Sequence, residues 1–246
     1  PAVLKYRMPN GHPEVPLEDV EQALRIMMGL EAGATGFTAG KVGIVGSSAG
    51  GHLAASASTL AETKPAFSIL FYPVITAEKG KGHQGSFNAL LGGSRNAESD
   101  TWYSLQNRVT AQTPPTLLLL SDDDKVVPPV NGILYYNALK EHGVKASMHI
   151  YPTGGHGWGI RDRFKYKEQW QQATLDWLKE LNDDRNTASV LLRQPGLPGC
   201  VDVGIRPATS RKSAGRELAE AVVQAAVQEF GQQVRSRRES DWPAGQ

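Results

Sequence analysis

Two patterns of apolar residues alternate along the first 181 positions of the chain. Short apolar runs bounded by Gly, Pro or Asp are typical of buried β-strands. Such runs predict strands at residues 2–6, 41–45, 67–71, 116–120 and 147–151. Residues 17–30 and 164–181 carry apolar side chains at helical spacing, which predicts helices that pack one face on a sheet. Alternating strands and helices predict the α/β class, with a mostly parallel sheet and helices on both faces.

The connection at residues 74–112 does not fit this alternation. It is rich in Gly, Ser and Asn, and it is too long for a simple link between a strand and a helix. We expect an excursion over the strand ends, where lids and substrate walls lie.

The composition of the chain changes near residue 182. Lys and Arg number 11 and 6 over residues 1–181, but 1 and 8 over residues 182–246. Residues 182–209 show little periodicity, and residues 214–234 carry an apolar stripe that predicts one amphipathic helix. We therefore expect a main domain at residues 1–181 and an appendage of uncertain fold at residues 182–246. A partner-binding helix is the alternative interpretation of the stripe.

Charge and composition exclude several classes of partner. The 26 Lys and Arg residues balance 25 Asp and Glu residues, which leaves no basic surface typical of nucleic-acid binding. No apolar run approaches the roughly 20 residues that cross a membrane, so neither nucleic acid nor a membrane is an expected partner. The single cysteine, Cys200, excludes an internal disulfide and a multi-cysteine metal site. The oligomeric state is left open by the sequence.

The strongest chemical signal lies where the second predicted strand meets an Ala-rich helix. Gly46, Ser48 and Gly50 form a G-x-S-x-G turn there, which is typical of a nucleophile elbow. In such a turn a side chain at either glycine is expected to collide with neighbouring elements, and the backbone N–H of Ala49 is expected to point at a developing oxyanion. The plain alternative is a turn that only joins a strand to a helix.

A phosphate-binding loop is the rival interpretation of this glycine-rich turn, because such loops bind anions through the same backbone donors. The pattern that ends in Gly-Lys-Ser or Gly-Lys-Thr is absent, and no Lys or Arg lies between Val42 and Thr63. The sequence therefore favours the nucleophilic serine.

A nucleophilic serine needs a base, and the base needs an acid that orients it, in the chain order Ser, Asp or Glu, His. Asp122, Asp123 and Asp124 follow the strand at 116–120, just ahead of a helix that begins near Pro128. Asp122 and Asp123 could simply solvate the loop or cap the turn, without any catalytic role. Asp124 is favoured as the acid because its D-x-x-V-P spacing resembles the acid loop of many serine hydrolases.

The candidate base is His156, which lies between glycines on the loop after the last predicted strand. Flanking glycines let this loop fold back over the sheet edge, so that the imidazole reaches both Ser48 and Asp124. His52 lies one turn into the elbow helix, where packing or solvation is a simpler role than catalysis. The remaining histidines are His12, His83, His142 and His149. No pair of histidines has metal-ligand spacing, so no metal and no cofactor are expected.

These motifs, together with residues 3–9 and 154–159, resemble the α/β-hydrolase esterases known as acetyl xylan esterases or xylanase-associated esterases. The resemblance covers about residues 2–180. It implies the hydrolase sheet, a triad of Ser48, Asp124 and His156, and removal of acetyl or similar short acyl groups from plant polysaccharides such as xylan. A prolyl-oligopeptidase-like serine peptidase shares the same triad and is the alternative.

The chain departs from this family at its front. The family carries a further strand before the elbow strand, followed by a loop such as His-Gly-Gly-Gly that donates the second oxyanion N–H. No such loop occurs here, so we expect either an N-terminally truncated domain or direct pairing of residues 2–6 with the elbow strand. A catalytically impaired fragment is a further alternative. Pro1 runs straight into apolar residues, so an upstream part is expected; a signal peptide there would indicate a secreted or periplasmic protein.

Overall fold

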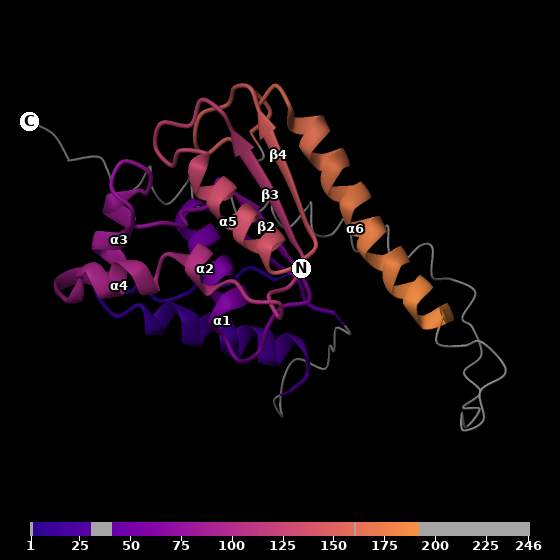
Figure 1. The fold of residues 1–246 in the computed structure, drawn as a ribbon, viewed down its shortest axis with the longest axis horizontal. Helices are drawn as coiled ribbons and strands as arrows, with labels where there is room; N and C mark the ends of the chain where they lie inside the picture. The colour runs from indigo at the N-terminus through magenta and orange to yellow at the C-terminus, as the bar shows by residue number, and fades with distance from the viewer. Residues whose placement is uncertain (1, 31–40, 160, 192–246) are drawn as a thin grey trace, which may run out of the picture. The chain divides into compact units, whose positions relative to one another are not determined.

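The computed structural model describes residues 2–30, 41–159 and 161–191. Within these residues the strands form one parallel sheet in the order β1-β2-β3-β4. Figure 1 labels β2, β3 and β4 of this sheet. The strands are β1 Ile44–Ser47, β2 Ser68–Phe71, β3 Thr116–Ser121 and β4 Ala146–Tyr151. The first residue of each strand is in register with the first residue of the next strand, from Ile44 through Ser68 and Thr116 to Ala146. The predicted α/β class is confirmed, and four of the five predicted strands are present.

The helices alternate with these strands as the apolar pattern predicts. The α-helices are α1 Glu14–Met27, α2 Ser48–Thr59, α3 Gln84–Leu91, α4 Ala97–Trp102, α5 Val130–Glu141 and α6 Lys167–Leu191. The described residues also contain two short 3-10 helices, η1 Gly92–Ser94 and η2 Leu105–Arg108. The helix predicted at 17–30 begins three residues earlier, and the helix predicted at 164–181 continues to Leu191. No helix in the described part of the chain is both long and apolar enough to cross a membrane.

The strand predicted at residues 2–6 is wrong. This segment has no regular structure, and Leu4 and Tyr6 pack against a cluster formed by α1 and α2 instead of pairing with β1. Leu4 and Tyr6 are half-buried against these helices and Val3 is exposed, so burial of this segment does not require a fifth strand. The alternative in which this segment pairs with the elbow strand is therefore also wrong. β1 is an edge strand of the sheet formed by the described residues.

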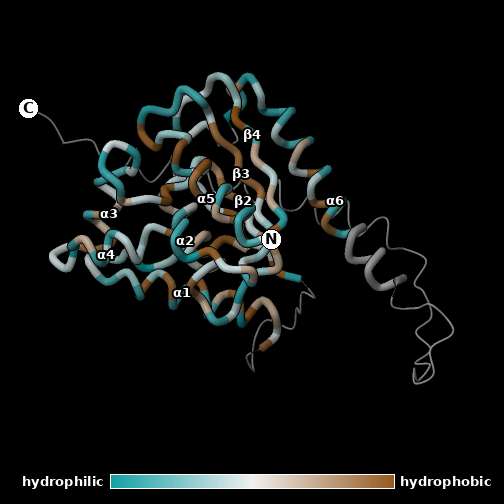
Figure 2. The backbone as a smooth tube through the Cα atoms, in the orientation of Figure 1, coloured by the Kyte–Doolittle hydropathy of each residue, from teal (hydrophilic) through white to brown (hydrophobic). Residues whose placement is uncertain are grey.

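The main core lies between the sheet and helices α2 and α5. Leu70 of β2 and Leu118 of β3 are register partners, so their side chains lie on the same face, where Ala55 of α2 and Leu139 of α5 cover them. All four side chains are completely buried. Burial of each leucine contributes roughly 1.5–3 kcal/mol relative to an exposed side chain. Figure 2 shows the hydrophobic colouring along β2 and β3 that corresponds to this core.

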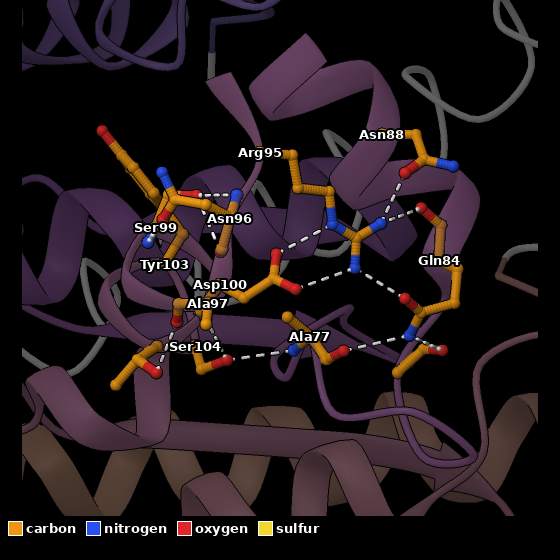
Figure 3. A network of polar contacts seen from close by, with 12 residues as sticks. Ala77, Gln84, Asn88, Arg95, Asn96, Ala97, Ser99, Asp100, Tyr103 and Ser104 are labelled. Carbon is orange, nitrogen blue, oxygen red and sulfur yellow. Dashed lines mark hydrogen bonds and ion pairs between the residues drawn. The ribbon is translucent and has the colours of Figure 1, made fainter. Parts of the chain in front are cut away.

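The excursion at residues 74–112 is largely helical, and Arg95 ties its parts together (Figure 3). Its guanidinium donates to both carboxylate oxygens of Asp100, at 2.8 and 3.1 Å. It also donates to Oε1 of Gln84 at 2.6 Å and to Oδ1 of Asn88 at 2.5 Å. The Arg95 side chain is only 17% exposed, so these bonds connect α3 to α4 in partly desolvated surroundings.

Residues 2–166 form one compact unit, and a second unit begins at Lys167 with α6. The buried side chains of α6 recur at helical spacing and are Trp170, Thr174, Trp177, Leu178 and Leu181. This agrees with the amphipathic pattern from which the helix was predicted. The helix runs without interruption across the predicted boundary at residue 182, whereas the helix predicted at 214–234 lies outside the described residues.

Candidate active site

The turn that carries Ser48 has no connecting residue between strand and helix. β1 ends at Ser47 and α2 begins at Ser48, whose φ of 54° lies in the left-handed region. This conformation costs roughly 1–2 kcal/mol for a residue with a Cβ atom, so it is kept only where the surrounding structure enforces it. The strained strand-to-helix turn expected from the G-x-S-x-G pattern is present.

The glycines around Ser48 have different roles. A Cβ atom at Gly46 would collide with the carbonyl of Gly50 and lie 2.9 Å from Cβ of Ala54, as expected. The collision expected at Gly50 is wrong, because its nearest neighbour, the hydroxyl of Tyr6, is 3.9 Å away. The second close approach is at Gly51 instead, where a Cβ atom would lie 2.9 Å from Cα of Pro73. The helix and the segment after β2 are therefore packed together through Gly51.

Three side chains from three strand ends meet at this turn. Nε2 of His156 lies 2.8 Å from Oγ of Ser48, and Nδ1 of His156 lies 2.7 Å from Oδ2 of Asp124. Ser48 follows β1, Asp124 follows β3 and His156 follows β4. The side chain of Asp124 is 1% exposed and that of His156 is 17% exposed. The structure thus brings together the three residues that the sequence singled out.

Backbone donors hold the carboxylate of Asp124 in one orientation. Its Oδ1 accepts hydrogen bonds from the N–H groups of Val126 and Val127, each at 2.9 Å. The other oxygen is therefore free to accept from Nδ1–H of His156. With its proton on Nδ1, the imidazole presents an unprotonated Nε2 to the Ser48 hydroxyl. This arrangement can take the proton of Ser48 and later return it to a leaving group.

The loop of His156 depends on glycines and on a neighbouring aspartate. Gly154, Gly155 and Gly157 have φ angles of 152°, 60° and 73°. A Cβ atom at Gly154 would lie 2.6 Å from Oγ of Ser121, so the loop passes too close to the end of β3 for a side chain. Oδ1 of Asp123 accepts the N–H of Gly155 at 2.7 Å. Asp123 thus anchors the loop of His156, a role that was not predicted from the sequence.

Aromatic rings pack against the imidazole of His156. Tyr72, which directly follows β2, meets the His156 ring edge to face at 4.7 Å between centroids. Trp158 packs against Tyr72 at 5.2 Å and stacks on Phe164 at 4.0 Å. Burial raises the pKa of Tyr72, so the phenol is neutral beside the histidine. Sequence reasoning missed Tyr72, because an aromatic residue at a strand end carries no local signal of its partner.

Asn131 is a second residue that the sequence did not reveal. It is 1% exposed, and its Oδ1 accepts the N–H groups of Ile75 and Thr76 at 3.0 and 3.2 Å. Its Nδ2 donates to the carbonyls of Lys81 and Pro128. All four hydrogen bonds of the amide are made, so α5 fixes the segment after β2. That segment donates the N–H of Val74 to the carbonyl of Ser48 at 3.1 Å.

The expected packing role of His52 agrees with its surroundings. Its ring is buried, and burial lowers its pKa to about 4, so the ring is neutral. Nε2 must carry the proton, because it faces the carbonyl oxygen of Tyr103 at 3.0 Å, which can only accept. Of the remaining histidines, His12 lies beside Glu14, His83 and His142 lie at helix ends, and His149 lies in β4. Within the described ranges, no group of three His, Cys, Asp or Glu side chains could hold a metal ion.

Ala49 occupies the expected position for an oxyanion donor. It is exposed and lies in the first turn of α2, where backbone N–H groups have no carbonyl partner within the helix. The positive end of the helix dipole also lies at this turn. The sequence contains no His-Gly-Gly-Gly segment that would add a second donor.

Comparison with known proteins shows similarity to esterases over most of the chain. The chain is 42% identical over 185 residues to an acetylxylan esterase of Xylanibacter ruminicola, covering 73% of this chain and 38% of that protein. An acetyl ester-xyloside bifunctional hydrolase of Caldicellulosiruptor lactoaceticus is 33% identical, with a TM-score of 0.66 and 73% and 71% of the two chains covered. The resemblance to acetyl xylan esterases inferred from the motifs is confirmed.

A more distant structure shows the fold alone. An α/β hydrolase from a Medee basin deep-sea metagenome library is 21% identical with a TM-score of 0.52, covering 69% of this chain and 65% of that one. The α/β-hydrolase fold is therefore confirmed. Residues 15–184, from α1 into α6, match the prolyl oligopeptidase family, and the chain belongs to that family.

Proposed function

We propose that the chain is a serine esterase that removes acetyl and similar short acyl groups from plant polysaccharides such as xylan. The observation that carries the proposal is the continuous path of hydrogen bonds from Asp124 through His156 to Ser48, at 2.7 and 2.8 Å. The names of the relatives support the substrate: one is an acetylxylan esterase, and a solved one is an acetyl ester-xyloside hydrolase. The chain spans about two fifths of the length of the acetylxylan esterase, at 38%.

In the proposed mechanism Ser48 attacks the carbonyl carbon of the ester while Nε2 of His156 takes the hydroxyl proton. Asp124 stabilises the imidazolium that forms, and the N–H of Ala49 donates to the oxyanion of the tetrahedral intermediate. The intermediate collapses when His156 returns the proton to the leaving alcohol, which leaves an acyl group on Ser48. Water, activated by the same histidine, then releases the carboxylic acid and restores the serine. No cofactor is needed for these steps.

The test is hydrolysis of p-nitrophenyl acetate and release of acetate from acetylated xylan. Ser48→Ala should lower kcat/KM by about 10⁴-fold or more, because the nucleophile is lost. Ser47→Ala is the matched control, since Ser47 precedes the nucleophile and its side chain makes no capping hydrogen bond to α2. Equal activity of the Ser48→Ala and unaltered proteins would contradict the proposal.

A peptidase remains the second candidate, because the family to which the chain belongs is named for prolyl oligopeptidase. The same triad can cleave amides, so the two functions differ in the leaving group alone. Glycyl-prolyl p-nitroanilide serves as the amide substrate. The peptidase would be established, and the esterase overturned, if the protein cleaves this amide faster than it cleaves the ester and if Ser48→Ala abolishes the cleavage. If neither substrate is turned over by a folded protein, the catalytically impaired fragment is the correct interpretation.

We also propose that residues 1–181 are the catalytic unit and that residues 182–246 are an appendage to it. The match to the family supports this boundary because it stops at residue 184. Since α6 continues to Leu191, the proposed boundary lies within a helix, and a clean separation requires a cut after that residue.

A further inference from the structure

A pocket of about 250 Å³ begins at Ala49, the residue after the candidate nucleophile, and follows one face of α2. Its lining includes Ala49, His52, Leu53 and Ser56 of α2 and Leu60, which directly follows this helix. Their spacing of three, four and seven residues keeps them on one face, and the stretch from first to last spans about 16 Å at 1.5 Å per residue. The pocket is therefore elongated, and one end lies at the residue proposed to donate to the oxyanion. We call it the α2 pocket.

Two walls face this side of α2. One is the N-terminal segment, which contributes Tyr6, Met8 and several prolines, and the other is α3 with Phe87 and Leu90. The walls are joined where the N–H of Gly11 donates to the carbonyl of Ala89 at 3.3 Å. Met8 is 64% exposed, which makes its thioether a flexible part of the rim.

The α3 wall is held in place by polar contacts outside the pocket. The bonds of Arg95 to Gln84, Asn88 and Asp100 join α3 to α4 (Figure 3). The Arg95 guanidinium also lies 5.8 Å from the centroid of Phe87, whose ring lines the pocket. The buried ring of His52, on α2, forms a hydrogen bond to the carbonyl of Tyr103 at 3.0 Å. The pocket is thus largely formed before any ligand binds.

The lining of the α2 pocket suits an apolar ligand and not a sugar. Among the described residues that form it there is no Asp, Glu, Lys or Arg. His52, near its middle, is neutral because burial lowers its pKa to about 4. The lining also contains Ser56, whose hydroxyl donates to the carbonyl of His52, and His83 and Ser86, which contact each other at 2.9 Å. Because these polar groups already have partners, they would leave most hydroxyl groups of a saccharide without one, which is costly.

The position of the pocket indicates which part of an ester it receives. The leaving alcohol must lie beside Nε2 of His156, which protonates it, but neither His156 nor Asp124 lines the pocket. Ala49, which does line it, is the proposed donor to the carbonyl oxygen. The substituent that extends from the carbonyl carbon into the α2 pocket is therefore the acyl group.

We propose that the α2 pocket is an acyl-binding subsite that accepts straight acyl chains of about six to eight carbons, so that acetyl is the smallest acyl group of a wider range. The size follows from the volume: a cavity of about 150 Å³ holds benzene, with six carbon atoms, and a pocket of about 250 Å³ holds about ten heavy atoms. This inference rests on the proposed esterase function and specifies the acyl half of its substrate.

The experiment is a series of p-nitrophenyl esters from acetate to dodecanoate, measured on the full chain. Each buried methylene can raise kcat/KM by up to about fourfold, so hexanoate and octanoate should exceed acetate by about tenfold or more. Dodecanoate, which is longer than the pocket, should fall below octanoate. A series that declines steadily from acetate would overturn the inference while leaving the esterase intact.

Two variants test whether the α2 pocket is responsible. Ala89→Trp adds an indole at an exposed pocket position on α3 and should lower the ratio of octanoate to acetate activity by about tenfold; Ala97→Trp, on α4 outside the pocket, is the matched control. Leu90→Ala widens the pocket and should move the optimum to longer chains. Unchanged ratios in both pocket variants would place the acyl chain elsewhere.

A binding measurement keeps the test independent of turnover. In the Ser48→Ala protein, calorimetry should detect binding of sodium octanoate, which Ala89→Trp weakens and Ala97→Trp does not; sodium acetate should show no such dependence. If esters are not hydrolysed but octanoate binds in this way, the proposed function fails and the pocket assignment stands. Absence of octanoate binding overturns the pocket assignment.

Discussion

Asp123 accepts a 2.7 Å hydrogen bond from the N–H of Gly155, the residue that precedes His156. Two adjacent aspartates therefore act on the same loop: Asp124 contacts the imidazole and Asp123 contacts the backbone beside it. The bond from Gly155 lowers the pKa of Asp123, since it stabilises the charged carboxylate. The stabilisation is present above the unfolded-state pKa of about 3.9 and is lost as the pH falls through the lower folded-state value.

Asp123→Ala should lower kcat for p-nitrophenyl acetate, because the loop is no longer anchored and Nε2 of His156 leaves its position beside Ser48. A displacement of about 1 Å can cost up to about 10²-fold in rate. Asp123→Asn keeps an oxygen acceptor and should retain most of the activity. Full activity in Asp123→Ala, or an equal loss in both variants, would show that the hydrogen bond does not position His156.

The two glycines after Ala49 provide a matched pair for the packing of the elbow. Gly51→Ala should destabilise the protein by about 1–3 kcal/mol, because its Cβ atom would lie 2.9 Å from the backbone of Pro73. Gly50→Ala meets nothing closer than 3.9 Å and should change stability by less than about 1 kcal/mol, since alanine favours a helix. Denaturant unfolding of both variants measures the difference. Equal losses would contradict the close approach at Gly51.

The contrast between these glycines illustrates what the sequence can reveal. The strained turn at Ser48 follows from a local pattern, because strand, turn and helix are contiguous in the chain. Whether Gly50 or Gly51 tolerates a side chain depends on Pro73, more than twenty residues away, and no local pattern contains that information. The same applies to Tyr72 and Asn131, whose contacts are made by tertiary packing.

The strand predicted at residues 2–6 failed for a related reason. An apolar run indicates that side chains are buried. It does not show whether the segment itself forms a strand or packs as irregular chain against helices. The order of Ser48, Asp124 and His156 was more informative, because the carboxyl ends of parallel strands share one edge of a sheet. The contact between these three side chains could therefore be predicted from the sequence. Their catalytic roles are still predictions, which the variants described above would test.

The proposed appendage leads to a prediction about truncation. Removal of the residues after Leu191 leaves α6 whole, together with its buried face at Trp170 and Leu181. The melting temperature should change by less than about 2 °C and the rate of ester hydrolysis should be unaltered, since a change of 1 kcal/mol shifts a protein of this size by about 2–4 °C. Thermal unfolding and p-nitrophenyl acetate assays check both. A fall of several degrees would show that the removed residues belong to the fold.

The buried histidine of the α2 pocket gives the protein a predicted acid sensitivity. Burial lowers the pKa of His52 from its ordinary value of 6.5 to about 4. Between these values the unfolded chain binds a proton that the folded protein does not, so stability falls as the pH drops below about 6.5. The gap of about 2.5 pH units corresponds to roughly 3 kcal/mol, reached near pH 4.

Denaturant unfolding between pH 7.5 and 4 measures this loss. In His52→Gln the amide can still donate to the carbonyl of Tyr103, but it cannot titrate, so the decline below pH 6.5 should become shallower by most of that amount. His12→Gln is the control, because the His12 side chain is 70% exposed and lies outside the core. Identical pH profiles for His52→Gln and the unaltered protein would mean that folding does not lower the pKa of His52. The protonated ring would then point its Nδ1–H toward the hydroxyl of Ser56, which lies 3.4 Å from Nδ1.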